Sequence, residues 1–179
     1  MKRRLVAVLL LSTLAGLGVA PAVAQDPEPS VAVDRIAFGE LPSIAVPLDG
    51  FMWVLDRRGA AIGKIDPDTN ELVDVIDLPE LVEGTRSAWD LEAARGSLWL
   101  TIPSKKRIAE IDPDTHEVRS LLRTRGFVSN VDSARGSLWF VRGTERRTVL
   151  VRVDPASRKT VATFRLGGHN TGVGGLTAF

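Results

Sequence analysis

The sequence of 179 residues contains no cysteine and only two histidines, which excludes several kinds of chemistry. Without cysteine there is no disulfide framework, no thiol nucleophile, no thiolate metal site and no lipidated cysteine. His116 lies in the turn-like stretch DPDTHE and has no second histidine at a metal-ligand spacing, which is typical of a solvated turn residue. We therefore expect no metal site and no cofactor.

Helical periodicity is also missing, and the one long apolar run stands at the N-terminus. The basic start MKRR, the run LVAVLLLSTLAGLGVA and the small residues Ala22 and Ala24 follow the order of a secretory signal peptide. Polar residues and glycines interrupt the run, which falls short of the ~20 apolar residues of a membrane span. We predict a signal peptide over 1–24, a flexible leader over 25–30, no transmembrane segment in the mature chain, and a secreted or periplasmic location.

An excess of positive charge is absent once this signal peptide is removed. Its removal takes away Lys2, Arg3 and Arg4, so that 23 − 3 = 20 basic side chains face 22 acidic ones, a formal charge of 20 − 22 = −2. Such a balance offers no electrostatic basis for binding nucleic acid, and we predict that nucleic acid is not a partner.

The chain does contain an internal repeat with two independent markers. The first marker, GFMW and then GSLW twice, ends at Trp53, Trp99 and Trp139, which are spaced by 46 and 40 residues. The second marker, IDPDT in two copies and VDPAS in the third, begins 12, 12 and 14 residues after the tryptophan. Two markers in a constant order indicate a structural unit of 40 to 46 residues.

Each unit divides into four short runs of β-branched and aromatic residues, separated by Gly, Pro and Asp. The run around each tryptophan is apolar at consecutive positions, which indicates burial on both faces of a sheet. Four antiparallel strands per unit, stacked against neighbouring units, make the blade of a β-propeller. We predict blades over about 41–80, 87–123 and 127–166, a lone strand before them at 31–38, and the start of a fourth blade at 172–179.

The predicted fold class is therefore all-β, a partial propeller over residues 31–179. Closed propellers have four to eight blades, so three blades leave two sheet faces and two edges uncovered. We expect the chain to be a fragment of a larger propeller, because it stops within a predicted strand. The alternative is that copies of the chain associate through their open blade faces.

The pattern D-L-x-A-x-x-G-S-L-W-L, followed by I-D-P-x-T-x-x-V, resembles the YVTN-type repeats of bacterial propellers, which grade into the virginiamycin B lyase (streptogramin lyase) propellers. The shared letters are turn and core residues, so the resemblance implies a fold and not an activity. Because those lyases use histidine with a divalent metal, the resemblance makes His169 in LGGHNTG a candidate base. The P-H-G-I-like loops of the lyases are absent, since the corresponding loops read GTRSAWD, GFVSNVD and HNTGVGG.

Charge is distributed unevenly among the loops of the predicted blades. Successive hairpins of a meander alternate ends, so the loops between second and third strands share one rim and the turns between third and fourth strands share the other. The turns hold mainly Asp and Glu, against Arg158 and Lys159, and the loops hold eight cations against Asp56 and Glu145. The predicted binding residues are these eight cations: Arg57, Arg58, Lys105, Lys106, Arg107, Arg142, Arg146 and Arg147.

A basic rim of this kind favours docking to an anionic envelope polymer, a lipid surface or an acidic protein. Ordinary solvated loops with no binding role can also contain these residues. We predict a secreted, non-catalytic module that binds an unknown ligand or protein partner, with an anionic envelope polymer as the first candidate. One alternative is a virginiamycin B lyase-like or hydrolase-like enzyme whose active site lies partly in missing blades. The other alternative is a truncated product without a function of its own.

Overall fold

A computed structural model describes residues 35–59, 61–82, 88–144 and 147–167. The predicted signal peptide, leader and fourth blade, together with His169, lie outside the described residues. Within the described ranges the chain forms twelve β-strands, one short helix α1 (Pro79–Val82) and one 3-10 turn η1 (Pro103–Lys105). No helix in these ranges is long and apolar enough to cross a membrane.

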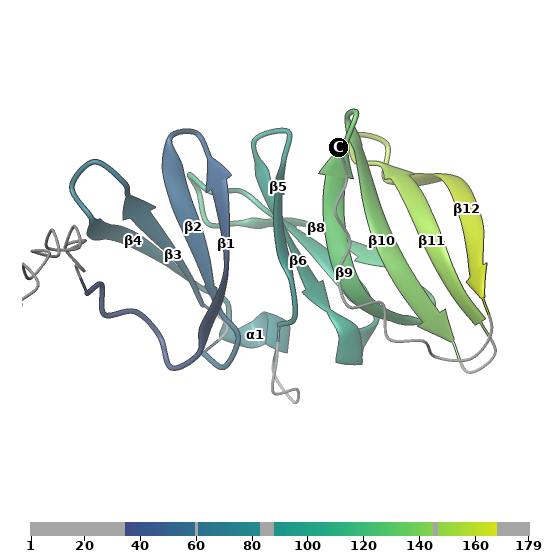
Figure 1. The fold of residues 1–179 in the computed structure, drawn as a ribbon, viewed down its shortest axis with the longest axis horizontal. Coiled ribbons are helices and arrows are strands. Elements are labelled where there is room, and N and C mark those ends of the chain that lie inside the picture. Colours follow the sequence, from purple (N-terminus) through teal and green to yellow (C-terminus); the bar gives the residue numbers. More distant parts are fainter. Residues whose placement is uncertain (1–34, 60, 83–87, 145–146, 168–179) are drawn as a thin grey trace, which may run out of the picture. The chain divides into compact units, whose positions relative to one another are not determined.

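The twelve strands form three antiparallel sheets of four, each built from strands that are consecutive in the chain (Figure 1). The first blade contains β1 (Pro42–Leu48), β2 (Phe51–Asp56), β3 (Ala61–Asp66) and β4 (Glu71–Asp77). The second contains β5 (Leu91–Ala94), β6 (Ser97–Ile102), β7 (Arg107–Ile111) and β8 (Val118–Arg123). The third contains β9 (Phe127–Ala134), β10 (Ser137–Thr144), β11 (Arg147–Asp154) and β12 (Lys159–Gly167). The predicted fold class, three four-stranded antiparallel blades, is confirmed.

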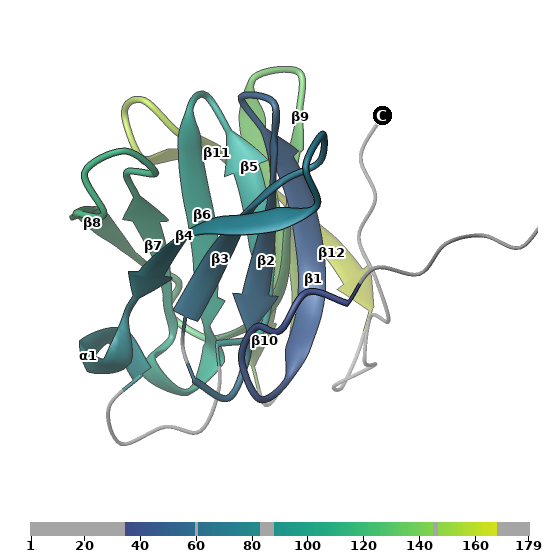
Figure 2. The same ribbon diagram turned by 90° about the vertical axis from the view of Figure 1, so that its left-hand side faces the viewer.

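The first strands of the three blades lie side by side. Strand β5 packs against both β1 and β9, and these three strands lie close together in Figure 2. The blades therefore stack face to face along one shared inner edge, with β4, β8 and β12 as the outer strands.

The recurring letters ARG belong to the two-residue turn between the first and second strands of a blade. Both central residues have positive φ, at 54° and 70° for Arg95 and Gly96 and at 50° and 71° for Arg135 and Gly136. Positive φ at both positions defines the type I′ turn, whose twist matches that of antiparallel strands. The first blade makes the same turn with an Asp-Gly pair, at 51° and 82°.

The recurring letters DP belong to the turn between the third and fourth strands. Asp66, Asp112 and Asp154 each accept, at 2.8 Å, a hydrogen bond from the backbone N–H two residues later. This side-chain contact closes the turn without help from the rest of the sheet, and proline sets the φ of its second residue. The same letters therefore produce the same turn in every blade.

The core lies between facing sheets. Trp53 of the first blade shares a buried cluster with Leu98 of the second, and Trp99 of the second blade shares one with Leu138 of the third. Both indoles are 2% exposed, and each Nε1–H donates to the carbonyl five residues earlier, at 3.4 and 3.3 Å. Every residue of β6 is buried, as expected of a strand whose two faces both meet a neighbouring sheet.

Trp139 holds the equivalent position in the third blade, but its surroundings differ. Its side chain is only half-buried, and its Nε1 has no hydrogen-bond partner. The ring stacks on Phe164, which is 48% exposed, at a centroid distance of 6.1 Å. Among the described residues no further sheet covers this face, so the third tryptophan gains less from burial than the other two.

Residues 35–38, the described part of the predicted lone strand, pair with no strand in the described ranges. Phe38 instead packs against β3 of the first blade. A Cβ added at Gly63 would lie 3.0 Å from the Phe38 ring and 2.9 Å from Leu72 Cδ1, so glycine leaves room for this ring.

Polar contacts join neighbouring blades at both ends of the interface. At the turns between third and fourth strands, His116 Nε2 lies 2.8 Å from Asp74 Oδ2 of the first blade. The Arg158 guanidinium also reaches the preceding blade, donating to Glu110 Oε2 on β7 at 2.9 Å. His116 and Arg158 occupy the same turn position and have φ of 62° and 57°.

At the inner edge, two carboxylates of the second blade join it to the third. Asp90 Oδ2 accepts the Val131 backbone N–H at 2.9 Å, and Glu92 Oε1 accepts the Ser133 hydroxyl at 2.7 Å. Burial raises the pKa of both carboxyl groups, and the nearby charge of Asp132 adds to the effect. These hydrogen bonds hold the second blade against the third. Burial nevertheless makes the ionised forms of Asp90 and Glu92 less favourable than they are in water.

Trp99→Ala should lower the free energy of unfolding by about 3–5 kcal/mol, because it empties a site between two sheets. Trp139→Ala should lower it by less than roughly half as much, because that indole is only half-buried and donates no hydrogen bond. Urea unfolding followed by circular dichroism measures both changes. Equal losses would show that Trp139 is packed as tightly as Trp99.

Asp90→Asn should stabilise the protein at pH 7, because the amide resembles the protonated carboxyl group: it keeps one oxygen to accept either the Val131 or the Leu91 N–H, and the penalised charge is gone. Since folding raises the pKa of Asp90, its contribution to stability is largest below the unfolded pKa and is lost as pH rises through the folded pKa. The gain should therefore vanish at about pH 3, where Asp90 is protonated in both states. Urea midpoints at the two pH values test this, with exposed Asp77→Asn as control, and a gain independent of pH contradicts it.

Candidate functional site

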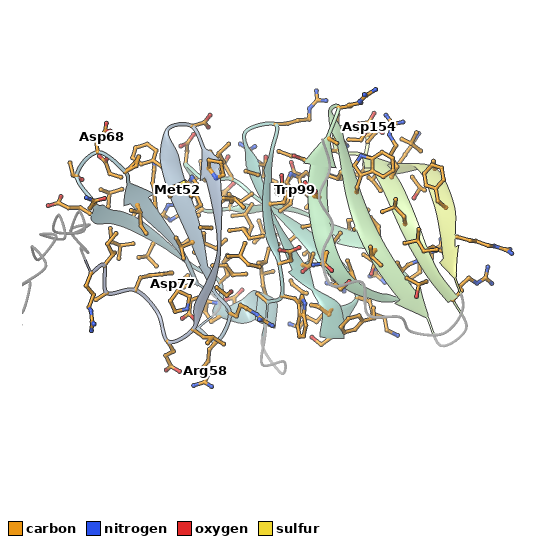
Figure 3. The ribbon with its side chains drawn as sticks, in the orientation of Figure 1. Met52, Arg58, Asp68, Asp77, Trp99 and Asp154 are labelled. Carbon is orange, nitrogen blue, oxygen red and sulfur yellow. The ribbon has the colours of Figure 1, made fainter. Side chains whose placement is uncertain are left out.

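The loops of the three blades gather at two opposite ends of the sheets. In each antiparallel sheet, the hairpin between the second and third strands lies at the same end as the connection to the next blade. We call this end the basic rim and the opposite end the turn rim. Figure 3 shows Arg58 at one end of the sheets and Asp68 and Asp154 at the other.

A buried carboxylate organises the first hairpin of the basic rim. Asp56 is 2% exposed, and it accepts the backbone N–H groups of Glu40, Leu41 and Arg58 at 2.9–3.1 Å. Burial acts to raise the pKa of Asp56, but these N–H groups outweigh burial and hold the pKa below its ordinary value. The Asp56 carboxylate therefore fixes the shape of the hairpin and does not neutralise the rim cations.

Several of the predicted binding residues are engaged inside the structure. The Arg57 guanidinium carbon lies 4.5 Å from the centroid of the Trp89 ring. Arg58 forms an exposed ion pair with Glu40 at 3.5 Å. Such a pair between solvent-exposed side chains is weak and leaves the arginine available to a ligand.

Two more of the predicted cations hold backbone carbonyls. Lys105 Nζ donates to the Glu80 carbonyl at 3.2 Å, and the Arg142 guanidinium donates to the Thr124 carbonyl at 3.2 Å. Arg147 is exposed at the start of β11. Arg146 lies outside the described residues.

The remaining two predicted binding residues are Lys106 and Arg107. They lie beside cations that were not predicted. Arg107 on β7 is directly opposite Arg123 on β8 in the strand register. The Thr124 backbone N–H donates to the Lys106 carbonyl at 3.0 Å, which brings the connection between β8 and β9 against the hairpin between β6 and β7. We call the resulting cluster the basic ridge: Lys105, Lys106, Arg107, Arg123 and Arg125.

The basic ridge contains no acidic side chain within either of its two segments, 103–107 and 123–127. Like charges directly opposite each other on a sheet are destabilising. At this position the other blades have no like-charge pair, because the equivalent pairs are Ala61 opposite Asp77 and Val149 opposite Arg165. Like charges do face each other elsewhere, since Asp66 lies opposite Glu71 in the first blade. Opposed arginines are therefore not a requirement of the fold, and they mark the ridge as the candidate site.

An exposed aromatic cluster adjoins the basic ridge. Trp89 is 40% exposed and Phe127 is 48% exposed, and their rings meet edge to face with centroids 6.2 Å apart. The Trp89 backbone N–H donates to the Thr101 carbonyl at 3.0 Å, just before η1, and β9, which begins at Phe127, packs against η1. With Arg57 over its ring, Trp89 connects the loops of the first and second blades.

The turn rim was predicted to be acidic, but its charge is mixed. The turns between first and second strands place Arg95 and Arg135 there, and Arg119 pairs with Asp112. Backbone N–H groups lower the pKa of Asp112 and of Asp154, with those of Asp114 and Ser157 as the respective largest contributions. The acids of this rim mainly close their own turns, so we assign no ligand to them.

The residues of interest for catalysis are not brought together in the described part of the chain. His116 lies on the turn rim against Asp74, and His169 lies outside the described residues. In the described ranges no three His, Cys, Asp or Glu side chains gather as a metal site would require.

No family model matches the sequence, and no curated protein matches it. Solved structures do have a similar fold. Hydrazine synthase of Kuenenia stuttgartiensis has a TM-score of 0.56 and 6% identity, over 68% of this chain and 34% of that chain. The Pan2 WD40 domain of Neurospora crassa has a TM-score of 0.55 and 12% identity, over 70% and 36%. Glutaminyl cyclase of Myxococcus xanthus has a TM-score of 0.51 and 12% identity, over 68% and 51%.

Identities this low show a shared fold and nothing more. The chain spans between 34% and 51% of the length of these three structures. They are β-propeller proteins, and the three sheets of this chain are blades of that fold. The finer resemblance to YVTN-type and virginiamycin B lyase-like repeats stays a prediction.

Proposed function

We propose that this chain is a non-catalytic β-propeller module that binds an anionic polymer on its basic rim, through the basic ridge. The observation that carries the proposal is the register of Arg107 opposite Arg123, within two segments, 103–107 and 123–127, that contain five cations and no acidic residue. An anionic chain laid along the ridge relieves the repulsion between the two arginines. It also finds planar guanidinium groups, which bind carboxylate, sulfate or phosphate oxygens in pairs.

A polymer suits this ridge better than a small anion. Each contact with an exposed cation contributes little by itself, because water and salt screen charges beyond about 8 Å at physiological ionic strength. Repeated charges on one polymer engage several cations without new losses of translational freedom, so the contacts reinforce one another. The predicted signal peptide agrees with a partner outside the cytoplasm, such as an anionic envelope polymer.

The lyase-like or hydrolase-like alternative rests on His169 alone, which has no described surroundings. No observation on the basic rim favours it, because the two segments of the ridge contain no histidine and no carboxylate to act as general acid or base beside the lysines. Binding without turnover is therefore the function that the geometry supports best.

Charge reversal on the ridge should weaken polymer binding. We expect Arg107→Glu with Arg123→Glu to lower the affinity of the full chain for polygalacturonate, an acidic polysaccharide, at least tenfold at low salt. We also expect wild-type affinity to fall as salt rises. The matched control is Arg95→Glu with Arg135→Glu, which makes the same change in net charge on the turn rim. Titration calorimetry measures both variants, and equal losses would reject the ridge in favour of net charge.

Removing one arginine of the opposed pair should stabilise the free protein. Arg123→Glu places an acid opposite Arg107, so the free energy of unfolding should rise by about 0.2–1 kcal/mol while polymer binding weakens. Urea unfolding at low ionic strength measures the first effect. A loss of stability would mean that the arginine pair carries no repulsion for a ligand to relieve.

A further inference from the structure

We propose that the polymer is an acidic polysaccharide, whose sugar rings stack on Trp89 and Phe127 while its acidic groups meet the basic ridge. This inference rests on the proposed function and names its ligand class. The ridge alone attracts any polyanion, whereas the aromatic cluster selects polymers that present flat apolar rings between their charges.

Trp89 is not needed by the fold. The three strand tryptophans stand at the repeat position, and ten residues before each of them lie Ser43, Trp89 and Ser129. Two blades thus form with serine where the second has tryptophan. A 40%-exposed indole contrasts with the 2%-exposed Trp53 and Trp99, which pack between sheets. An exposed indole beyond the needs of packing indicates a contact surface.

The aromatic cluster adjoins both segments of the basic ridge. Phe127 stands two residues after Arg125, and the Trp89 backbone is bonded to Thr101, immediately before the segment that carries Lys105. Arg57 lies over the Trp89 ring, 4.5 Å from its centroid, so a ligand contacts the part of the indole that stays exposed. A chain crossing Trp89 and Phe127 therefore meets cations on the adjoining loops.

The chemistry of a sugar matches this surface. One face of a pyranose ring presents C–H groups, which carry partial positive charge and pack on the negative face of an aromatic ring. Uronic acids or sulfate esters on the same chain supply anions for the ridge. Trp89 and Phe127 meet edge to face at 74°, so they offer no pair of parallel platforms for successive nucleobases. This arrangement favours a polysaccharide over single-stranded nucleic acid.

The test compares two polymers of matched charge, polygalacturonate, which has pyranose rings, and poly-L-glutamate, which has none. In calorimetric titrations of the full chain we expect polygalacturonate to bind at least tenfold more tightly. Trp89→Ser should abolish that preference while leaving poly-L-glutamate affinity within about twofold, because Ser129 shows that serine fits this place in a blade. Trp89→Phe should retain most of the preference, since it keeps an aromatic face.

Folding of each variant is checked by its urea midpoint, and Phe127→Leu, which keeps an apolar side chain, repeats the test at the second ring. A variant that binds both polymers as the wild type does would overturn the stacking role. Tighter binding of oligothymidylate than of polygalacturonate would overturn the ligand class. If both polyanions bind through the ridge without preference, the proposed function stands and this inference fails. If the ridge reversal leaves all binding intact, the proposed function fails as well.

Discussion

The burial of one tryptophan between each pair of neighbouring sheets is the constraint on which the structure depends. Trp53 and Trp99 each fill an interface, and an aromatic side chain of this size dominates the apolar area buried there. Each indole also donates to a carbonyl at the end of the preceding strand, so the sheet must keep a single register. A fixed register determines which hairpins share a rim, and hence which side chains form a common surface.

The architecture was predictable from the repeat, because the residues that mark it satisfy local requirements. Arg95-Gly96 occupies a turn that needs positive φ twice, and Asp112 closes the next turn with its own side chain. Such requirements do not depend on distant residues, so the same letters give the same element in each blade. Trp139 shows the limit of this reasoning, since its burial depends on whether another sheet covers it.

The candidate site was predictable only in part, because a loop residue's availability depends on its neighbours in space. Arg57 and Arg142 have the charge expected of binding residues, yet one lies over an indole and the other holds a carbonyl. Arg123 and Arg125 were missed because the first ends a fourth strand and the second follows it, although that end of the strand lies on the same rim. The signal that finds them is topological, since every second connection of a meander lies at one end of its sheet.

Comparison among blades separates what folding requires from what it permits. A position that must support the fold has the same kind of residue in each blade, as the strand tryptophans and the turn aspartates do. Among the departures of the second blade from its neighbours are Arg107 in place of Ala61 and Val149, and Trp89 in place of two serines. The first departure opposes like charges and the second exposes an indole, so neither improves the folded state. Both lie on the basic rim, where the acidic polysaccharide that we propose would offset both disadvantages at once.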